Sequence, residues 1–377
     1  MMKDAGKLVD SGKPITVAVL GSHSALEVCA GAKAHGFRTL VIAEKGREKV
    51  YVETYRTRKE NGKTLGVVDE TIVLGKFKEI LSAETISRLN ERNSVFVTNR
   101  SFQVYTDFDY DAIEDEFSVP ILGSRRLLRA EERNQPKNQY HLLQKAGLKH
   151  PKQFKSHDEI DRLCIVKVNE ASRGFERSFF FASTPEEYER KAMEKILKGE
   201  ITKPALENAI IEEFAVGVPV NLNFFYSPVA GRTELLGTDT RRQTSLDGIL
   251  RLPAAQQLDL SKQMQPSFEE AGHCAVTVLE SLLGKIQDMG EKFVSACKEE
   301  YPPGIIGPFA LQCAVTPGPP GKELVVFDVS LRMPGSPGIQ YTPYSSYLHG
   351  ESFSAGRRLA MELRNAVDCG KLSEVLT

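Results

Sequence analysis

The sequence has almost no net charge, no long apolar run and no close pair of cysteines. Its formal charge is −1, from 49 basic and 50 acidic residues, so it lacks the basic field with which nucleic-acid-binding proteins attract phosphates. No apolar stretch approaches the roughly 18 residues that cross a membrane, and the first residues lack the apolar segment of a secretory signal. Its six cysteines include no CxxC pair, which favours buried, reduced thiols. These absences predict a cytoplasmic protein that binds neither nucleic acid nor a membrane.

Short β-type runs alternate with amphipathic helical segments over the first 120 residues. This alternation is typical of βαβ units that form a parallel sheet. No GxGxxG follows the first run, which argues against a dinucleotide-binding dehydrogenase. The expected strands are 16–20, 39–43, 67–74 and 94–99.

The pattern changes after residue 121, where charged helical segments separate β-rich pieces. A chain of 377 residues has room for two or three domains at roughly 150 residues each. We expect helices near 123–151, 185–199 and 284–300, strands within 164–183, 208–228, 233–243, 248–254, 307–315 and 323–332, a loop over 333–350, and a last helix.

The stretch "GSHS", Gly21–Ser24, lies where the first strand passes into a helix. The free N–H groups of a helix start bind anions, and the histidine and the two serines add donors, while either serine can cap the helix. Lys45 and Arg47 follow the next strand and would lie at the same sheet edge. The alternatives are a simple serine cap beside an exposed histidine, and a solvated basic turn.

Lysines and carboxylates in the middle of the chain suggest a nucleotide site. Lys167 lies inside the apolar run "CIVKV", where a lysine either reaches solvent or points into a cleft that needs a cation. The turn "NEASRGFER" could cover phosphates, and "IIEEFAVG" offers carboxylates for an adenine amino group or ribose hydroxyls. The candidate residues are Lys137, Lys167, Ser172, Gly174, Glu212 and Glu213.

Gln312 and Asp328 lie on two successive expected strands, which suggests a metal site. Their oxygens suit Mg²⁺, which also binds substrate phosphates. Alternation places Asp328, Ser330 and Arg332 on one face, where the arginine would neutralise a phosphoryl group in transfer. The alternative is a solvent-facing polar stripe. Five other histidines share no ligand spacing, so we expect these at the surface or in caps: His35, His150, His157, His273 and His349.

Taken in order, these features resemble the ATP-grasp ligases. A narrower resemblance, to the archaeal formate-dependent AICAR ribonucleotide synthetase family, is carried by collinear segments over nearly the whole chain. These are "LGSHSALEVCAGAKAHGF", "KGR", "VPILGSRRLLRAEE", "FYSP", "ELLGTDTRRQTSLDGILRLPA" and "PPGIIGPFALQ".

The resemblance implies an α/β fold in which an N-terminal parallel-sheet (Rossmann-like) domain precedes a two-subdomain α+β ATP-grasp module. The expected boundaries are 1–124 for the domain that binds the nucleotide substrate, 125–215 for the small subdomain with its flap, and 216–377 for the subdomain with the metal site. It also implies symmetric assembly, so we expect a homo-oligomer.

The implied reaction joins formate to the amino group of AICAR ribonucleotide with ATP and Mg²⁺ or Mn²⁺. Formyl phosphate is the expected intermediate, and FAICAR, ADP and phosphate are the products. By the resemblance, His23, Ser24, Ser101 and Ser245 would contact AICAR, Gln312 and Asp328 would hold the metal, and His23 and Arg332 would serve catalysis.

The sequence departs from the family pattern at three places. The segment "VNEASRGFERSFFF" keeps only Gly174, Ser245 replaces an asparagine in "TSLDG", and Asp328 stands where the family has glutamate. Two alternatives therefore remain open: an ATP-grasp ligase with a different acid or amine, and a nucleotide-binding protein without turnover.

Overall fold

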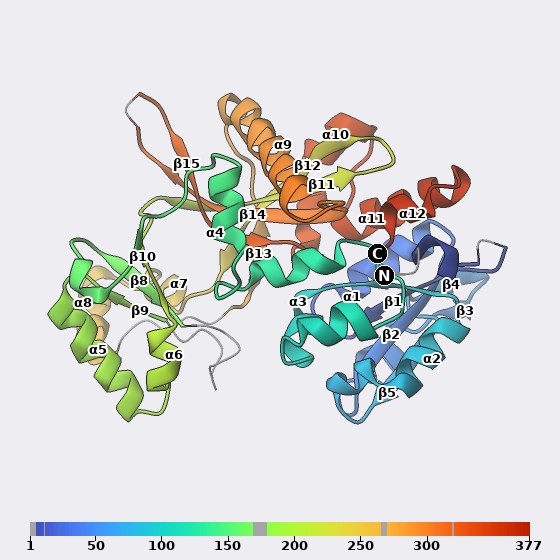
Figure 1. The fold of residues 1–377 in the computed structure, drawn as a ribbon, viewed down its shortest axis with the longest axis horizontal. Coiled ribbons are helices and arrows are strands. Elements are labelled where there is room, and N and C mark those ends of the chain that lie inside the picture. Colours follow the sequence, from blue (N-terminus) through green and yellow to red (C-terminus); the bar gives the residue numbers. More distant parts are fainter. Residues whose placement is uncertain (1–4, 11, 169–178, 265–269, 319) are drawn as a thin grey trace.

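The computed structural model describes residues 5–10, 12–168, 179–264, 270–318 and 320–377. Its elements form three sheets of four, four and five strands and a separate hairpin. Figure 1 shows the sheets as three bodies, with the N-terminal one in blue, a small green one opposite it, and a larger C-terminal one in yellow to red.

The N-terminal sheet is parallel, in the order β5-β2-β1-β6. All five residues of β1 are buried, as expected for a parallel strand covered on both faces. All four strands expected in the first 120 residues are confirmed and lie in this sheet. The strands are β1 (Thr16–Leu20), β2 (Arg38–Glu44), β5 (Glu70–Leu74) and β6 (Ser94–Val97), and the helices are α1 (Ala25–Ala34), α2 (Ala83–Glu91) and α3 (Arg100–Tyr105).

The small sheet is antiparallel, in the order β7-β10-β8-β9. Its inner side chains pack on the helix expected near 185–199, which is α5 (Pro185–Leu197), and its core includes Phe180 and Tyr188. The elements are β7 (Gln153–Phe154), β8 (Cys164–Lys167), β9 (Phe179–Ala182), α6 (Lys203–Glu207) and β10 (Ile210–Glu213). Helix α4 (Gln139–Lys145) precedes them but packs on the long helix α9 (Leu283–Glu300) of the large sheet.

The large sheet is antiparallel, in the order β13-β12-β11-β14-β15. Its core is aromatic: Phe309 stacks on Phe224 and on Phe293, which comes from the long helix α9. The elements are β11 (Val218–Ser227), β12 (Arg232–Arg242), α7 (Leu246–Ile249), α8 (Ala254–Gln263), β13 (Gly272–Ala275), α9 (Leu283–Glu300), β14 (Gly307–Thr316) and β15 (Glu323–Ser330).

The C-terminal helices return to the N-terminal body. Helix α11 (Ala355–Asp368) packs on α1. Gly31 and Gly356 allow the two helices to approach closely, because a Cβ on either glycine would overlap the backbone of the opposite helix. An antiparallel bridge joins Leu122 to Leu376, beyond α12 (Leu372–Val375). This packing fixes the N-terminal sheet against the C-terminal body (Figure 1).

The structure differs from four expectations. Residues 248–254 form no strand, because β13 instead pairs with β12. The piece 208–228 is divided between two sheets as β10 and β11. The loop 333–350 contains a 3-10 helix and α10 (Tyr344–His349). Cys274 and Cys369 are exposed rather than buried.

A hairpin was also not anticipated from the sequence. Its strands, β3 (Arg58–Glu60) and β4 (Lys63–Leu65), are fully exposed, so they lack the apolar alternation that identifies a strand. Its turn is Asn61-Gly62, both with positive φ, as this type of turn requires. None of the described helices combines the length and apolar character needed to pass through a bilayer.

Candidate active site

A cavity of about 310 Å³ opens between the small and large sheets. Strands β8 and β10 form one wall, and β14 and β15 form the other. Its lining combines apolar side chains with a few charged ones, as ligand pockets do. The residues that line the cavity include Arg133, Ile165, Lys167, Glu212, Glu213, Phe214, Arg241, Gln312, Ala314 and Asp328.

Lys167 points into this cavity rather than into solvent. Its Nζ forms an ion pair with Glu212 and donates to the Phe327 carbonyl at 3.1 Å. Burial lowers the pKa of Lys167, although Glu212 opposes this effect. The Tyr140 hydroxyl donates to the other oxygen of Glu212. A buried lysine held in this way presents a fixed cation to the cavity.

Gln312 and Asp328 face one another on paired strands, as the sequence predicts. The Gln312 amide donates to Asp328 at 3.3 Å, and Arg133 donates to the other carboxylate oxygen at 3.0 Å. Burial opposes the charge of Arg133, but Asp328, Tyr140 and Glu212 together outweigh burial and raise the pKa of Arg133. Flipping the side-chain amide of Gln312 would place its oxygen beside the carboxylate of Asp328. This donor set fits Mg²⁺, which takes few protein carboxylates and completes its shell with phosphates and water.

Arg332 lies between this cavity and the N-terminal loop. Its side chain is 10% exposed, and its Nε lies 3.6 Å from Glu131 and has no hydrogen-bond partner among the described residues. Burial lowers the pKa of Arg332; the charge of Glu131 opposes this most strongly, and Asp328 adds a smaller effect in the same direction. Burial lowers the pKa of His23, and the positive charge of Arg332 lowers it further.

The loop after β1 brings His23 to the C-terminal body. Asn99 fixes the loop, since its side-chain amide donates to the His23 carbonyl at 2.8 Å and the Leu20 carbonyl at 3.1 Å. The imidazole of His23 lies against Gly335 so closely that a Cβ there would overlap its Nε2. Ser101 donates to Ser22 at 2.8 Å, so the structure places these hydroxyls beside the loop.

Ser24 does not cap α1 with its side chain as the sequence suggested. It has φ of 67°, in the left-handed region, and its hydroxyl donates to the Pro334 carbonyl. The hydroxyl thus joins this loop to the segment after β15.

Other expected site residues lie away from the cavity. Lys137 pairs with Glu300 at 2.8 Å and is half exposed, and Ser245 begins α7; neither is among the described residues that line the cavity. Arg47 is exposed and donates to Tyr105 at 2.8 Å. Lys45, at the same turn, is also exposed. Ser172 and Gly174 lie outside the described residues.

His273 is buried beside His23, not at the surface as expected. Its Nδ1 lies 2.7 Å from the buried carboxylate of Asp239, and its Nε2 lies 3.3 Å from Glu270. Burial would lower the pKa of His273, but the hydrogen bonds to Asp239 and Glu270 outweigh it and raise the pKa to about 9. The same bond from His273 lowers the pKa of Asp239 against the effect of burial. The two ring centroids of His23 and His273 are 6.5 Å apart.

The sequence reading missed several of these residues. Asp239 and Arg241 alternate on one face of β12, a signal visible in "TDTRR". The spacing of Glu270 and His273 is also visible, but their proximity to His23 depends on tertiary packing. No sequence pattern identified Arg133 or Tyr140.

Two family models cover most of the chain. Residues 17–154 match a protein of unknown function (DUF1246), and residues 187–377 match a domain of unknown function (DUF1297).

Solved structures place the fold in a known class. The chain is similar to an IMP biosynthesis protein PurP from Thermococcus kodakaraensis, with a TM-score of 0.69 and 28% identity over 96% of this chain and all of that one. It also shares its fold with the ADP complex of N5-carboxyaminoimidazole ribonucleotide synthetase, with a TM-score of 0.55 and 12% identity over 90% of this chain and 78% of that one. The fold is that of the ATP-grasp class.

Curated relatives then identify the family. The chain is 40% identical over 363 residues to the 5-formaminoimidazole-4-carboxamide-1-(beta)-D-ribofuranosyl 5'-monophosphate synthetase of Methanopyrus kandleri, covering 96% of this chain and 95% of that protein. It is 37% identical to the protein of the same name from Methanocaldococcus jannaschii, with the same coverage. The chain belongs to this synthetase family.

Proposed function

We propose that the protein is an ATP-dependent ligase that joins formate to the 5-amino group of AICAR ribonucleotide. The products are FAICAR, ADP and phosphate. The names of the relatives support this reaction. The observation that carries the proposal for this chain is the position of Arg332, whose charge reaches Asp328 in the cavity and His23 on the N-terminal loop. A cationic side chain between two sites suits the transfer of a phosphoryl group and then of an acyl group.

ATP occupies the cavity between the two sheets. Ile165, Phe214 and Ala314 provide apolar contacts for the base. Glu213 supplies an acceptor for the adenine amino group or the ribose, while Glu212 positions Lys167 through their ion pair. Lys167 contacts the phosphates of ATP. Gln312 and Asp328 would hold Mg²⁺, which neutralises phosphate charge when bound.

Formate attacks the terminal phosphorus of ATP from the Arg332 side. A bond forms between a formate oxygen and phosphorus, the bond to the bridging oxygen breaks, and ADP leaves. Arg332 and Arg133 offset the charge that spreads over the equatorial oxygens. Because Arg332 is buried, its charge acts in a medium of low dielectric, where it stabilises more than it would in water.

The amine of AICAR then attacks the carbon of formyl phosphate. The carbon–oxygen bond to phosphate breaks, phosphate leaves, and the amine loses a proton. His23, Ser24 and Ser101 bind the phosphate or ribose end of AICAR at the start of α1. We further propose that 1–124, 125–215 and 216–377 are the domains, that the protein acts in the cytoplasm, and that it assembles as a homo-oligomer.

The test is to measure ADP release with Mg²⁺, ATP, AICAR ribonucleotide and formate, and to omit each in turn. Turnover should require all four. It should fall at least about 100-fold in His23→Ala and Asp328→Ala, since loss of a positioning contact costs that much. His157→Ala and Asp161→Ala, which change side chains on the small subdomain, are matched controls.

The pattern of dependence separates the competing functions. Turnover that needs AICAR but not formate would mean a different acid. Thermal stabilisation by AICAR or ATP without any ADP release would mean a binding protein, because a ligand specific to the folded state raises apparent stability without turnover.

A further inference from the structure

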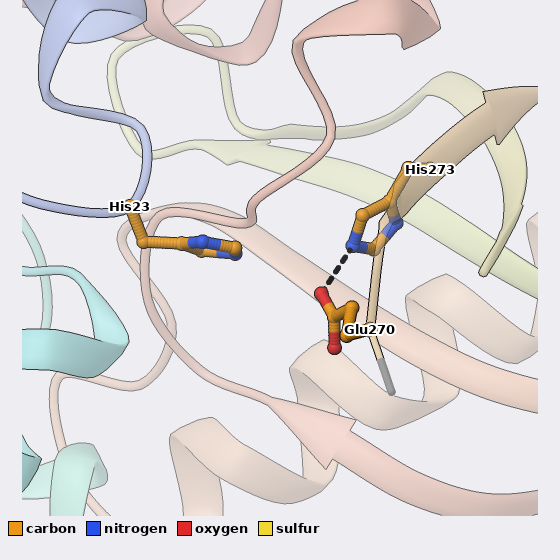
Figure 2. A group of neighbouring side chains, drawn as sticks. All are labelled: His23, Glu270 and His273. Atoms are coloured by element: carbon orange, nitrogen blue, oxygen red, sulfur yellow. Dashed lines mark ion pairs between the residues drawn. The ribbon is translucent and has the colours of Figure 1, made fainter. Parts of the chain in front are cut away.

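Three metal-ligating side chains meet where the N-terminal loop contacts the large sheet. His23 comes from the loop after β1, Glu270 immediately precedes β13, and His273 lies on β13. One donor atom of each lies within 4.8 Å of the other two. Figure 2 shows the imidazole of His23 pointing toward the His273–Glu270 pair from the opposite side. Glu270 and His273 are close in sequence, whereas His23 comes from the distant N-terminal loop, so only the fold brings it to the other two.

The surroundings of His273 are those of a metal ligand. A histidine that binds a metal usually donates its other ring N–H to a carboxylate, which fixes the ring and raises its basicity. Here Nδ1 contacts Asp239 at 2.7 Å. Asp239 is in turn held by Asn221 at 2.9 Å and by Ser336 at 2.8 Å. The carboxylate is therefore fixed before any ligand arrives.

This arrangement directs the second ring nitrogen of His273 into the cluster. The side chain is only 8% exposed, and Nε2 is directed at the carboxylate of Glu270 rather than at solvent. It lies 3.3 Å from Glu270 Oε1. Ligand bonds of about 2.0–2.1 Å in a tetrahedron separate the donors by about 3.3 Å, so this pair already has the spacing that zinc requires. His23 needs only a small movement to complete the set.

The charges around the cluster also matter for a cation. Asp239 and Glu270 attract one, whereas Arg241 and Arg332 repel it. Two imidazole nitrogens and one carboxylate oxygen suit a borderline transition-metal cation better than Mg²⁺, which prefers oxygen donors.

We propose that His23, Glu270 and His273 form a second cation site, for Zn²⁺ or a similar divalent transition metal. It is separate from the Gln312–Asp328 pair, and it does not depend on the proposed reaction. A bound ion would join the N-terminal loop to β13. Two imidazoles and one carboxylate leave a fourth position open, as in zinc sites that also bind a small ligand.

The test is direct measurement of zinc in the full-length protein without nucleotide or Mg²⁺. Exposed thiols are removed first by Cys274→Ser and Cys369→Ser, because Cys274 adjoins His273. The chelator-treated protein is then titrated with Zn²⁺, and bound metal is counted after gel filtration. We expect one zinc per chain in this background, and the same in it with His157→Ala.

Variants of the cluster distinguish this site from others. His23→Asn and His273→Asn should each weaken zinc binding at least tenfold, and Asp239→Asn should weaken it about 10- to 100-fold by releasing the ring. Asp328→Asn should leave it unchanged. If a histidine variant fails to fold, the exposed Glu270→Gln provides the same test. Unchanged binding in His273→Asn or in Glu270→Gln, or loss of zinc when the thiols are removed, would overturn the proposal.

Discussion

Gly335→Ala should displace His23 without removing a functional group. The new Cβ would overlap the imidazole Nε2, whereas ordinary contact between such atoms needs about 3.5 Å. The ring must therefore move by more than about 1 Å. Misplacement on that scale can cost about 100-fold in rate. Since φ of Gly335 is not in the left-handed region, alanine fits the backbone and the effect is confined to the side-chain contact.

The assay compares kcat/KM for AICAR with the affinity for ATP. We expect kcat/KM for AICAR to fall by about 100-fold and ATP binding to stay unchanged, because the ATP cavity lies beyond Arg332. Gly338→Ala is the matched control in the same segment, since a Cβ there contacts nothing within 4 Å. Equal kcat/KM in the two alanine variants would refute the placement of His23 in the substrate site.

Three further predictions concern buried charges and the second cation site. The pKa of His273 rises from 6.5 to about 9 on folding, so its contribution of about 3 kcal/mol is complete below pH 6.5 and disappears as pH rises through 9; urea unfolding should show this loss, and Asp239→Asn should abolish it. Lys167→Met should lower the free energy of unfolding by about 3–5 kcal/mol because Glu212 loses its ion-pair partner, and Lys167→Met with Glu212→Gln should recover most of it; equal losses in the same assay would refute the pairing. Because His23 belongs to both proposed sites, Zn²⁺ should raise the Kd for AICAR at least tenfold in calorimetry, and an unchanged Kd would mean that the sites do not overlap.

The sequence was most informative where burial is uniform. The first expected strand, 16–20, has the bounds of β1 because a strand covered on both faces is a continuous apolar run. The helix expected at 284–300 is α9, whose apolar residues recur on one face. The apolar run 248–254 was wrongly predicted as a strand. It lies at α7 and the start of α8, where the described residues are not buried.

The site was only partly predictable. Gln312 and Asp328 could be placed together because they lie on successive expected strands, whereas the register shift after Gln312 could not be foreseen. Lys167 was recognisable as a cation within an apolar strand. His273 was not, because its burial depends on Asp239 from another strand and on a loop more than 200 residues away in the sequence. Long-range packing of this kind leaves no local pattern.

Labelled formate provides a direct test of the proposed ligase reaction. The protein is incubated with [¹³C]formate, ATP, Mg²⁺ and AICAR ribonucleotide, and the nucleotide product is analysed by mass spectrometry beside the ADP formed. We expect label in the formyl group of FAICAR, with one ADP for each FAICAR. ADP without labelled FAICAR, or product in which the label is absent, would contradict it.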